Sequence, residues 1–337
     1  MTIGKTLAQF LLAAVGLVAA AGSAWAQSCG GSAGPPGAGG AVSDSSWLRS
    51  GQGAARLSQE YEVKDHSFRG ARRVPNDFRE TLFISRTALD VRYGVSDEWT
   101  AELTATYPHF TYRLKPPGGQ RSERHFRGPG DTLVLFGRRF ATGGGDEEGG
   151  AACSVEMPQM AETHAAAPTL SLWAGFTLPT GEAERPNPAF VTRDVSVANL
   201  QTGTGSFDPL LRARFDWPQH GWALFAQTDL RLPVYENRYR YRTGDSEALL
   251  AGAAVPVVSK LSASLTLMLQ RVGRDTFRGE DVGVGGARWL YAVPGASWQV
   301  TDAVAVDFSV RMPLYRRTQT KLSDSKVAYQ LGVSLRF

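Results

Sequence analysis

The chain ends with the stretch Val327-Ala328-Tyr329-Gln330-Leu331-Gly332-Val333-Ser334-Leu335-Arg336-Phe337. Large apolar residues take every second position, and small or polar residues take the positions between them. A period of two predicts a β-strand with one apolar face. An apolar edge strand at the end of a soluble protein would recruit other chains, whereas the last strand of a closed transmembrane barrel pairs with the first. The stretch therefore favours a membrane barrel, with an ordinary sandwich strand as the alternative.

The same alternation recurs upstream, in residues 222–234, 261–269 and 304–314. Each run is about ten residues long, which is the length of a tilted membrane strand. Aromatic residues gather near the ends of the expected strands, as in the interfacial girdles of membrane barrels. They are Trp99, Tyr107, Trp217, Trp222, Tyr235, Trp298 and Tyr315.

Two kinds of connection separate the runs. The short polar ones are 96–98, 218–221, 259–260 and 301–302, and the long charged ones are 65–78, 113–129, 181–204, 237–245, 274–284 and 316–325. The two kinds largely alternate, as periplasmic turns and outer loops do in outer-membrane barrels. We predict an all-β fold, a transmembrane antiparallel up-and-down β-barrel of about twelve strands with both termini in the periplasm. The expected strands are 52–64, 79–94, 98–112, 130–140, 168–180, 205–217, 222–236, 246–257, 261–273, 285–299, 303–315 and 326–337.

The N-terminal region predicts export. Residues 1–26 have the charged end, apolar core and Ala24-Trp25-Ala26 cleavage pattern of a signal peptide. Residues 27–51 predict a flexible Gly/Ser/Pro-rich periplasmic leader, and residues 52–337 the barrel, with a periplasmic insertion at 141–167. A lipidated N-terminus at Cys29 is the alternative, although the residues before it match a lipoprotein cleavage site poorly.

Composition limits the class of protein. Hydrophobic residues make up 42% of the 337 positions, and no stretch after the signal approaches the roughly 20 apolar residues of a spanning helix. A membrane protein of this composition has to cross with strands. The net charge of +4 is small and spread along the chain, so it gives no argument for nucleic acid.

Two short motifs carry a family resemblance. Leu178-Pro179-Thr180-Gly181, followed by 201–208 with the sequence Gln-Thr-Gly-Thr-Gly-Ser-Phe-Asp, resembles the outer-membrane proteins named for the MetA pathway of phenol degradation. The resemblance continues through the segment 311–315, which echoes 231–235, to the terminal Phe337. It implies a channel or transporter of the bacterial outer membrane. The insertion at 141–167 departs from the family pattern, so no particular substrate is carried over.

Charged residues of both signs fall on the inward parity of the expected strands. A charge inside a barrel has to be paired or to meet water. The set can be a salt-bridged interior that holds the barrel's shape, or a polar channel with an electrostatic constriction, and these readings are compatible. The candidates for the lining of a pore are Arg212, Arg214, Asp229, Arg231, Asp307 and Arg311.

An enzyme is the main alternative. A barrel esterase needs a nucleophilic serine and a histidine base at the outer rim. His109 and His125 bracket an outer loop, but no serine stands at a recognisable spacing. We therefore predict that the protein is not an enzyme.

The leader and the insertion hold the remaining candidates. Cys29 and Cys153 would lie on the same side of the membrane and in an oxidising compartment, so they are candidates for a disulfide. Cys153, Met157, Met160 and His164 would share one face of a helix and present soft ligands suited to Cu(I). An amphipathic helix with Cys153 in a disulfide is the favoured alternative, and we predict no cofactor.

These observations together predict passive passage of a small aromatic or amphiphilic solute through the outer membrane. A barrel hydrolase and a non-conducting structural or metal-handling barrel are the alternatives. The expected partners are outer-membrane lipid, lipopolysaccharide, the solute, and the barrel assembly machinery, which would recognise the C-terminal strand ending at Phe337.

Overall fold

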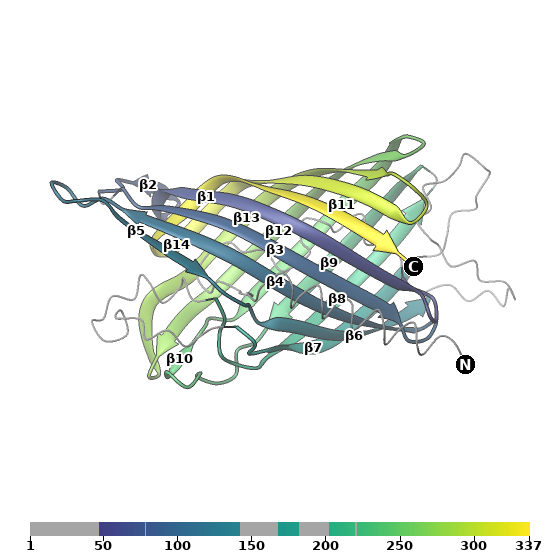
Figure 1. Ribbon diagram of the computed structural model, residues 1–337, viewed down its shortest axis with the longest axis horizontal. Coiled ribbons are helices and arrows are strands. Elements are labelled where there is room, and N and C mark those ends of the chain that lie inside the picture. Colours follow the sequence, from purple (N-terminus) through teal and green to yellow (C-terminus); the bar gives the residue numbers. More distant parts are fainter. Residues whose placement is uncertain (1–46, 78, 142–167, 182–201, 220) are drawn as a thin grey trace, which may run out of the picture.

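A computed structural model describes residues 47–77, 79–141, 168–181, 202–219 and 221–337. Their strands form one antiparallel sheet that closes on itself (Figure 1), because β12 pairs with both β11 and β13 and β1 pairs with both β3 and β14. Among the described residues, no helix is long and apolar enough to span a membrane. The strands are β1 (Gly53–Gly70), β2 (Arg72–Val74), β3 (Thr81–Gly94), β4 (Trp99–Leu114), β5 (Ser122–Arg127), β6 (Thr132–Ala141), β7 (Thr169–Leu178), β8 (Asp208–Gln219), β9 (Trp222–Arg231), β10 (Tyr241–Arg242), β11 (Ser246–Val258), β12 (Leu261–Phe277), β13 (Glu280–Gln299) and β14 (Val304–Arg336).

The element β14 contributes two strands to the barrel. Its first half pairs with β13 up to Thr318, and its second half pairs with β1 from Thr318 onward. The backbone N–H of Arg336 donates to the carbonyl of Ala303 at 2.8 Å, so the two ends of β14 lie side by side. The chain therefore turns back near the middle of β14. With β2, β5 and β10 as short additions at its edges, the barrel has twelve strands, as the alternation predicts.

The terminal strand closes the barrel as its sequence predicts. Phe337 donates its N–H to the carbonyl of Gly53 at 3.0 Å, and Gly53 donates back to the carbonyl of Phe337 at 2.8 Å. A Cβ atom on Gly53 would lie 2.1 Å from the Phe337 ring, so a larger residue here would require this aromatic side chain to shift. The first and last strands thus meet at the end of the barrel that carries the short turns.

The two faces of the sheet differ as the period of two requires. On the second half of β14, Tyr329, Leu331, Val333 and Leu335 are exposed on the outer face, while Ala328 is buried on the inner face. On β12, Leu265, Leu267 and Leu269 are about half exposed, whereas Thr266, Met268 and Gln270 between them are buried. The outer face is therefore an apolar surface suited to lipid, and the interior receives the polar and medium-sized side chains.

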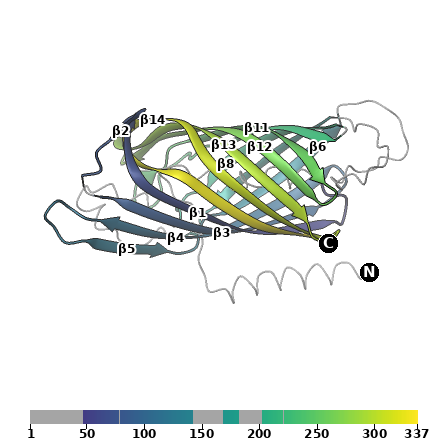
Figure 2. The ribbon, with the colours of Figure 1, turned by 90° about the horizontal axis from the view of Figure 1, so that it is seen from above.

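Several connections that the sequence predicts as long loops are partly strand. β1 continues to Gly70, β12 continues to Phe277, β13 begins at Glu280, and strand pairing extends to both sides of the turn within 316–325 of β14. The prediction is wrong there because these segments lie past the roughly ten residues that cross a membrane, where both faces of a strand meet polar surroundings. Ladder hydrogen bonds hold such strands without apolar alternation. The extensions make the long-loop end of the barrel project, as Figures 1 and 2 show.

The residues just before β1 enter the short-turn end. The Trp47 ring lies 5.4 Å from the ring of Trp173, a buried residue of β7, and its Nε1 donates to the carbonyl of Asp97 at 2.9 Å. Leu48 is buried beside it. This segment therefore packs against the inner surface at that end of the barrel.

Candidate functional site

The first group of interior charges spans β4, β8 and β9. Arg212 donates from Nε to Asp229 at 2.6 Å and from Nη1 to Glu102 at 3.1 Å. Glu102 stands on β4, and β6 and β7 lie between β4 and β8 in the sheet. The ion pair between Arg212 and Glu102 therefore runs along the inner surface over two intervening strands, and each side chain keeps 10% of its surface exposed to the interior space.

The neighbours of Arg212 continue this network along β8 and β9. Arg214 donates from Nε to Asp216 at 2.9 Å and from Nη1 to Gln227 at 3.1 Å. Gln227 in turn donates to Asp229 at 2.8 Å, and Arg231 donates from Nε to Asp208 at 2.9 Å. Each arginine on this wall has at least one carboxylate partner, so the group holds the inner wall in a fixed arrangement.

A second group lies on the wall formed by β1, β3 and β14. Arg56 donates through Nε and Nη2 to the two oxygens of Asp307, at 3.1 and 2.7 Å, and its Nη1 lies 3.8 Å from Asp90. The pair passes over Gly332, where a Cβ atom would lie 2.6 Å from Asp307 and 2.8 Å from Arg56. The glycine in the terminal strand therefore provides the room that the ion pair occupies.

Further toward the long-loop end, the same wall carries a denser set of charges. Arg311 contacts Glu60 at 2.7 Å and Glu62 at 3.5 Å. Arg86 lies 3.6 Å from Glu60, and Lys64 lies 4.0 Å from Glu62. We call these five residues the Glu60 cluster. It links β1, β3 and β14 on the inner surface.

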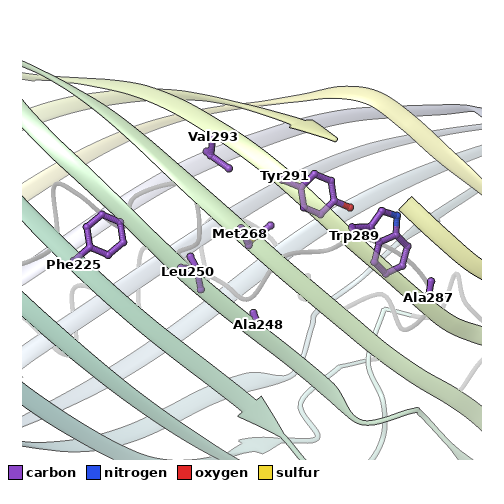
Figure 3. Close-up of a cluster of buried hydrophobic side chains, with 8 residues drawn as sticks. All are labelled: Phe225, Ala248, Leu250, Met268, Ala287, Trp289, Tyr291 and Val293. Atoms are coloured by element: carbon purple, nitrogen blue, oxygen red, sulfur yellow. The ribbon is translucent and has the colours of Figure 1, made fainter. Parts of the chain in front are cut away.

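The opposite wall carries an apolar stripe beside polar residues such as Thr266 and Gln270. Phe225, Leu250, Met268, Tyr291 and their neighbours form a buried stripe across β9, β11, β12 and β13 (Figure 3). We call it the apolar stripe, and its members are Phe225, Ala248, Leu250, Met268, Ala287, Trp289, Tyr291 and Val293. It meets the charged wall on both sides, because Arg214 lies 4.9 Å from the Phe225 ring centroid and Arg311 lies 5.4 Å from that of Tyr291. The interior therefore has a charged wall on one side and the apolar stripe on the other.

The two sequence motifs meet at the long-loop mouth. Asp131 accepts from the backbone N–H of Thr204 at 2.7 Å and from that of Gly181 at 3.3 Å. Asn237 donates to the carbonyl of Thr204 at 2.8 Å. A Cβ atom on Gly203 would lie 2.5 Å from the Cα of Gly181, so both glycines are needed for this approach. The two motifs therefore both donate hydrogen bonds to the buried carboxylate of Asp131.

Two buried carboxylates in this region have altered acidities. Burial raises the pKa of Asp131, and the hydrogen bonds from Thr204 act in the opposite direction. Asp275, on the part of β12 beyond the roughly ten residues that cross a membrane, is also buried, and this raises its pKa from 3.8 to about 6. It accepts hydrogen bonds from the Tyr241 hydroxyl and from Gly244 N, which oppose the shift without cancelling it.

The structure brings the predicted pore-lining candidates together in these networks. Arg212, Arg214, Asp229 and Arg231 belong to the first group, Asp307 to the second, and Arg311 to the Glu60 cluster. All six face the interior as their parity predicts. Whether they line a conducting path stays a prediction.

The structure does not describe the candidates for a disulfide and for a copper site. Cys29, Cys153, Met157, Met160 and His164 lie outside the described residues, as does the insertion at 141–167. Within the described residues, no group of three or more His, Cys, Asp or Glu could hold a metal ion.

The two rim histidines lie together on the hairpin of β4 and β5. The ring centroids of His109 and His125 are 5.9 Å apart, and the hydroxyl that contacts His125 belongs to Thr111, at 3.1 Å. Glu123 lies 3.5 Å from His125. His109 is exposed and stands on the parity opposite to the buried Thr104 and Thr106, so the pair faces away from the interior. The hairpin itself protrudes from the barrel (Figures 1 and 2).

Sequence reasoning missed most of the Glu60 cluster and Arg56. The signal was present in the first strand, where Arg56, Ser58, Glu60, Glu62 and Lys64 occupy one parity. Five polar residues in a row on one face of a membrane strand have to point inward. The same parity argument that places the charges of the later strands inside the barrel therefore also places these five residues inside it.

Comparison with known proteins gives the fold. No protein-family model matches the chain, and no curated protein matches it. An outer membrane channel from Pseudomonas putida F1 superposes with a TM-score of 0.61 at 14% identity, covering 87% of this chain and 98% of that chain. The NanC porin and the CymD monoaromatic hydrocarbon channel follow at TM-scores of 0.44 and 0.40, with 8% identity each, covering 83% and 86% of this chain and 98% and 89% of theirs. The chain therefore has the fold of an outer-membrane β-barrel, which is the fold that the motif resemblance implies.

Proposed function

We propose that the protein is a bacterial outer-membrane channel for the passive passage of small amphiphilic or aromatic solutes. The observation that carries this proposal is the two-faced interior, in which fixed ion pairs oppose the apolar stripe. The ion pairs, with 10–14% of their side chains exposed to the interior, would contact the polar part of a solute. The apolar stripe, whose members are at most 6% exposed, would yield to the apolar part, with binding weak enough at each to allow exit. The fold of a protein described as an outer membrane channel supports the same role.

The outer face fits the same location. Leu265, Leu267 and Leu269 present an apolar surface for lipid, and lipopolysaccharide would meet the outer rim. We propose that the barrel assembly machinery recognises the terminal strand that ends at Phe337, whose aromatic ring lies over Gly53 at the seam of the barrel.

Solute flux tests the proposal. Purified protein in liposomes should admit benzyl alcohol and small neutral sugars faster than protein-free liposomes do, as followed by swelling. Flux no faster than the protein-free background would contradict a channel. In the same preparation, hydrolysis of a short ester that is lost in His109→Ala or His125→Ala would favour the hydrolase instead.

A further inference from the structure

Arg86 has unused donors inside the barrel. Its side chain keeps only 9% of its surface exposed, and its one ion pair with a described residue joins Nη1 to Glu60 at 3.6 Å. Its Nε and Nη2 are buried and find no hydrogen-bond acceptor among the described residues. A buried donor without an acceptor is costly, and more so on a charged group. The guanidinium therefore has the capacity to bind one more acceptor, and its fork geometry suits a carboxylate.

The charges around Arg86 favour an anion. In the Glu60 cluster, the cations Arg86, Arg311 and Lys64 stand against the carboxylates Glu60 and Glu62. Arg311 already serves both carboxylates, so neither of them is without a cation when Arg86 turns to a different partner. Glu60 and Arg311 keep 14% and 11% of their side chains exposed, and this places the cluster at the border of the interior space.

The cluster also adjoins the apolar stripe. Arg311 lies over the ring of Tyr291, 5.4 Å from its centroid, and Tyr291 packs with Met268 and Leu250. Arg311 therefore lies between the stripe and Glu60, the carboxylate that pairs with Arg86.

We propose that Arg86 and the Glu60 cluster form a binding site for small organic anions, such as carboxylates. The carboxylate accepts from Nε and Nη2 of Arg86. This inference rests on the proposed channel function and narrows its solute class, from amphiphilic solutes in general to anionic ones.

The test uses the full-length channel in a planar bilayer, with benzoate as the probe and benzyl alcohol as its neutral counterpart. Reversal potentials in a salt gradient should show a preference for anions, and benzoate should reduce the chloride current at concentrations where benzyl alcohol does not. Arg86→Met should raise the benzoate concentration for half block by about tenfold or more, because hydrogen bonds to a charged group are lost. Arg86→Lys, which keeps the charge but not the fork, should fall between the two.

Arg271→Met is the matched control. It removes the same charge from the outer face of β12, where Arg271 pairs with Glu247 at 3.1 Å and both side chains are 46% exposed. It should leave the block by benzoate unchanged. A conducting wild-type channel that prefers cations, or that benzoate and benzyl alcohol affect equally, overturns the anion site and leaves the channel intact. If benzoate blocks Arg86→Met and the wild type equally, the anion site is also overturned. A wild-type protein that shows no conductance contradicts the channel function itself.

Discussion

Removing the carboxylate of Asp307 should destabilise the barrel through Arg56. Arg56 is only 2% exposed and has two hydrogen bonds to Asp307, at 3.1 and 2.7 Å, whereas Asp90 is its next carboxylate at 3.8 Å. Removing one partner of a buried ion pair costs about 3–5 kcal/mol, because the other charge stays buried. Since Asp90 remains within reach of Arg56, the cost of Asp307→Ala should lie near the lower end of this range, at about 3 kcal/mol.

Two further variants separate this cause from a general loss of packing. Arg56→Met combined with Asp307→Leu removes both charges, and it should cost less than about 1 kcal/mol, since apolar replacement of a buried pair is often neutral. Asp90 then keeps its hydrogen bond from Thr104 at 2.7 Å. Glu98→Ala breaks the exposed pair of Glu98 with Arg138, whose side chains are 60% and 45% exposed, so it should cost about 1 kcal/mol or less.

The free energy of unfolding is measured by urea denaturation in lipid vesicles, followed by tryptophan fluorescence. The reasoning is refuted if Asp307→Ala costs no more than Glu98→Ala. It is also refuted if the double variant is as unstable as Asp307→Ala alone, because the loss would then not arise from an unpaired Arg56.

Three further outcomes are expected. Because the pKa of Asp275 in the folded protein is about 6 against an ordinary 3.8, the protonated form favours the fold, and this stabilisation is complete below the ordinary value and lost as pH rises through about 6. Hydrogen exchange near Tyr241 should therefore show extra opening above that pH, and Asp275→Asn should remove the pH dependence; identical profiles would contradict it. Trp47→Ala removes the ring that packs on Trp173 at the short-turn end, so the unit conductance should rise, and an unchanged conductance would show that this segment does not narrow the path. Deletion of Phe337 should lower the fraction of chains that insert into outer membranes, as measured by heat-modifiable migration in gels, and normal insertion would contradict its role in assembly.

The alternation of apolar residues was sufficient to predict the barrel. Val333 and Leu335 on the outer face, with Gly332 and Ser334 between them, fix the register of the last strand because a slip by one residue would turn every apolar side chain inward. The pairing of Phe337 with Gly53 follows from closure of a barrel with an even strand number.

The strand extensions and the partners of each interior charge could not be predicted in this way. Past the apolar band, ladder hydrogen bonds and polar side-chain contacts such as Arg316–Asp324 hold β1 and β14, and their polar sequence resembles that of a loop. Parity placed Arg212 on the inside, but two strands lie between its strand and that of its partner Glu102. Which of several inward carboxylates a long arginine side chain reaches depends on the shear and curvature of the barrel, and a pattern along one strand does not contain them.

Single-channel recording in planar bilayers tests the central claim most directly. The wild-type barrel should give discrete conductance steps. Arg231→Ala, which leaves Asp208 without the guanidinium that donates to it at 2.9 Å, and Arg311→Ala, which removes the cation between Glu60 and Glu62, should each change the size or ion selectivity of those steps. A folded, inserted wild-type barrel that gives no steps would contradict the account, as would steps that neither substitution alters.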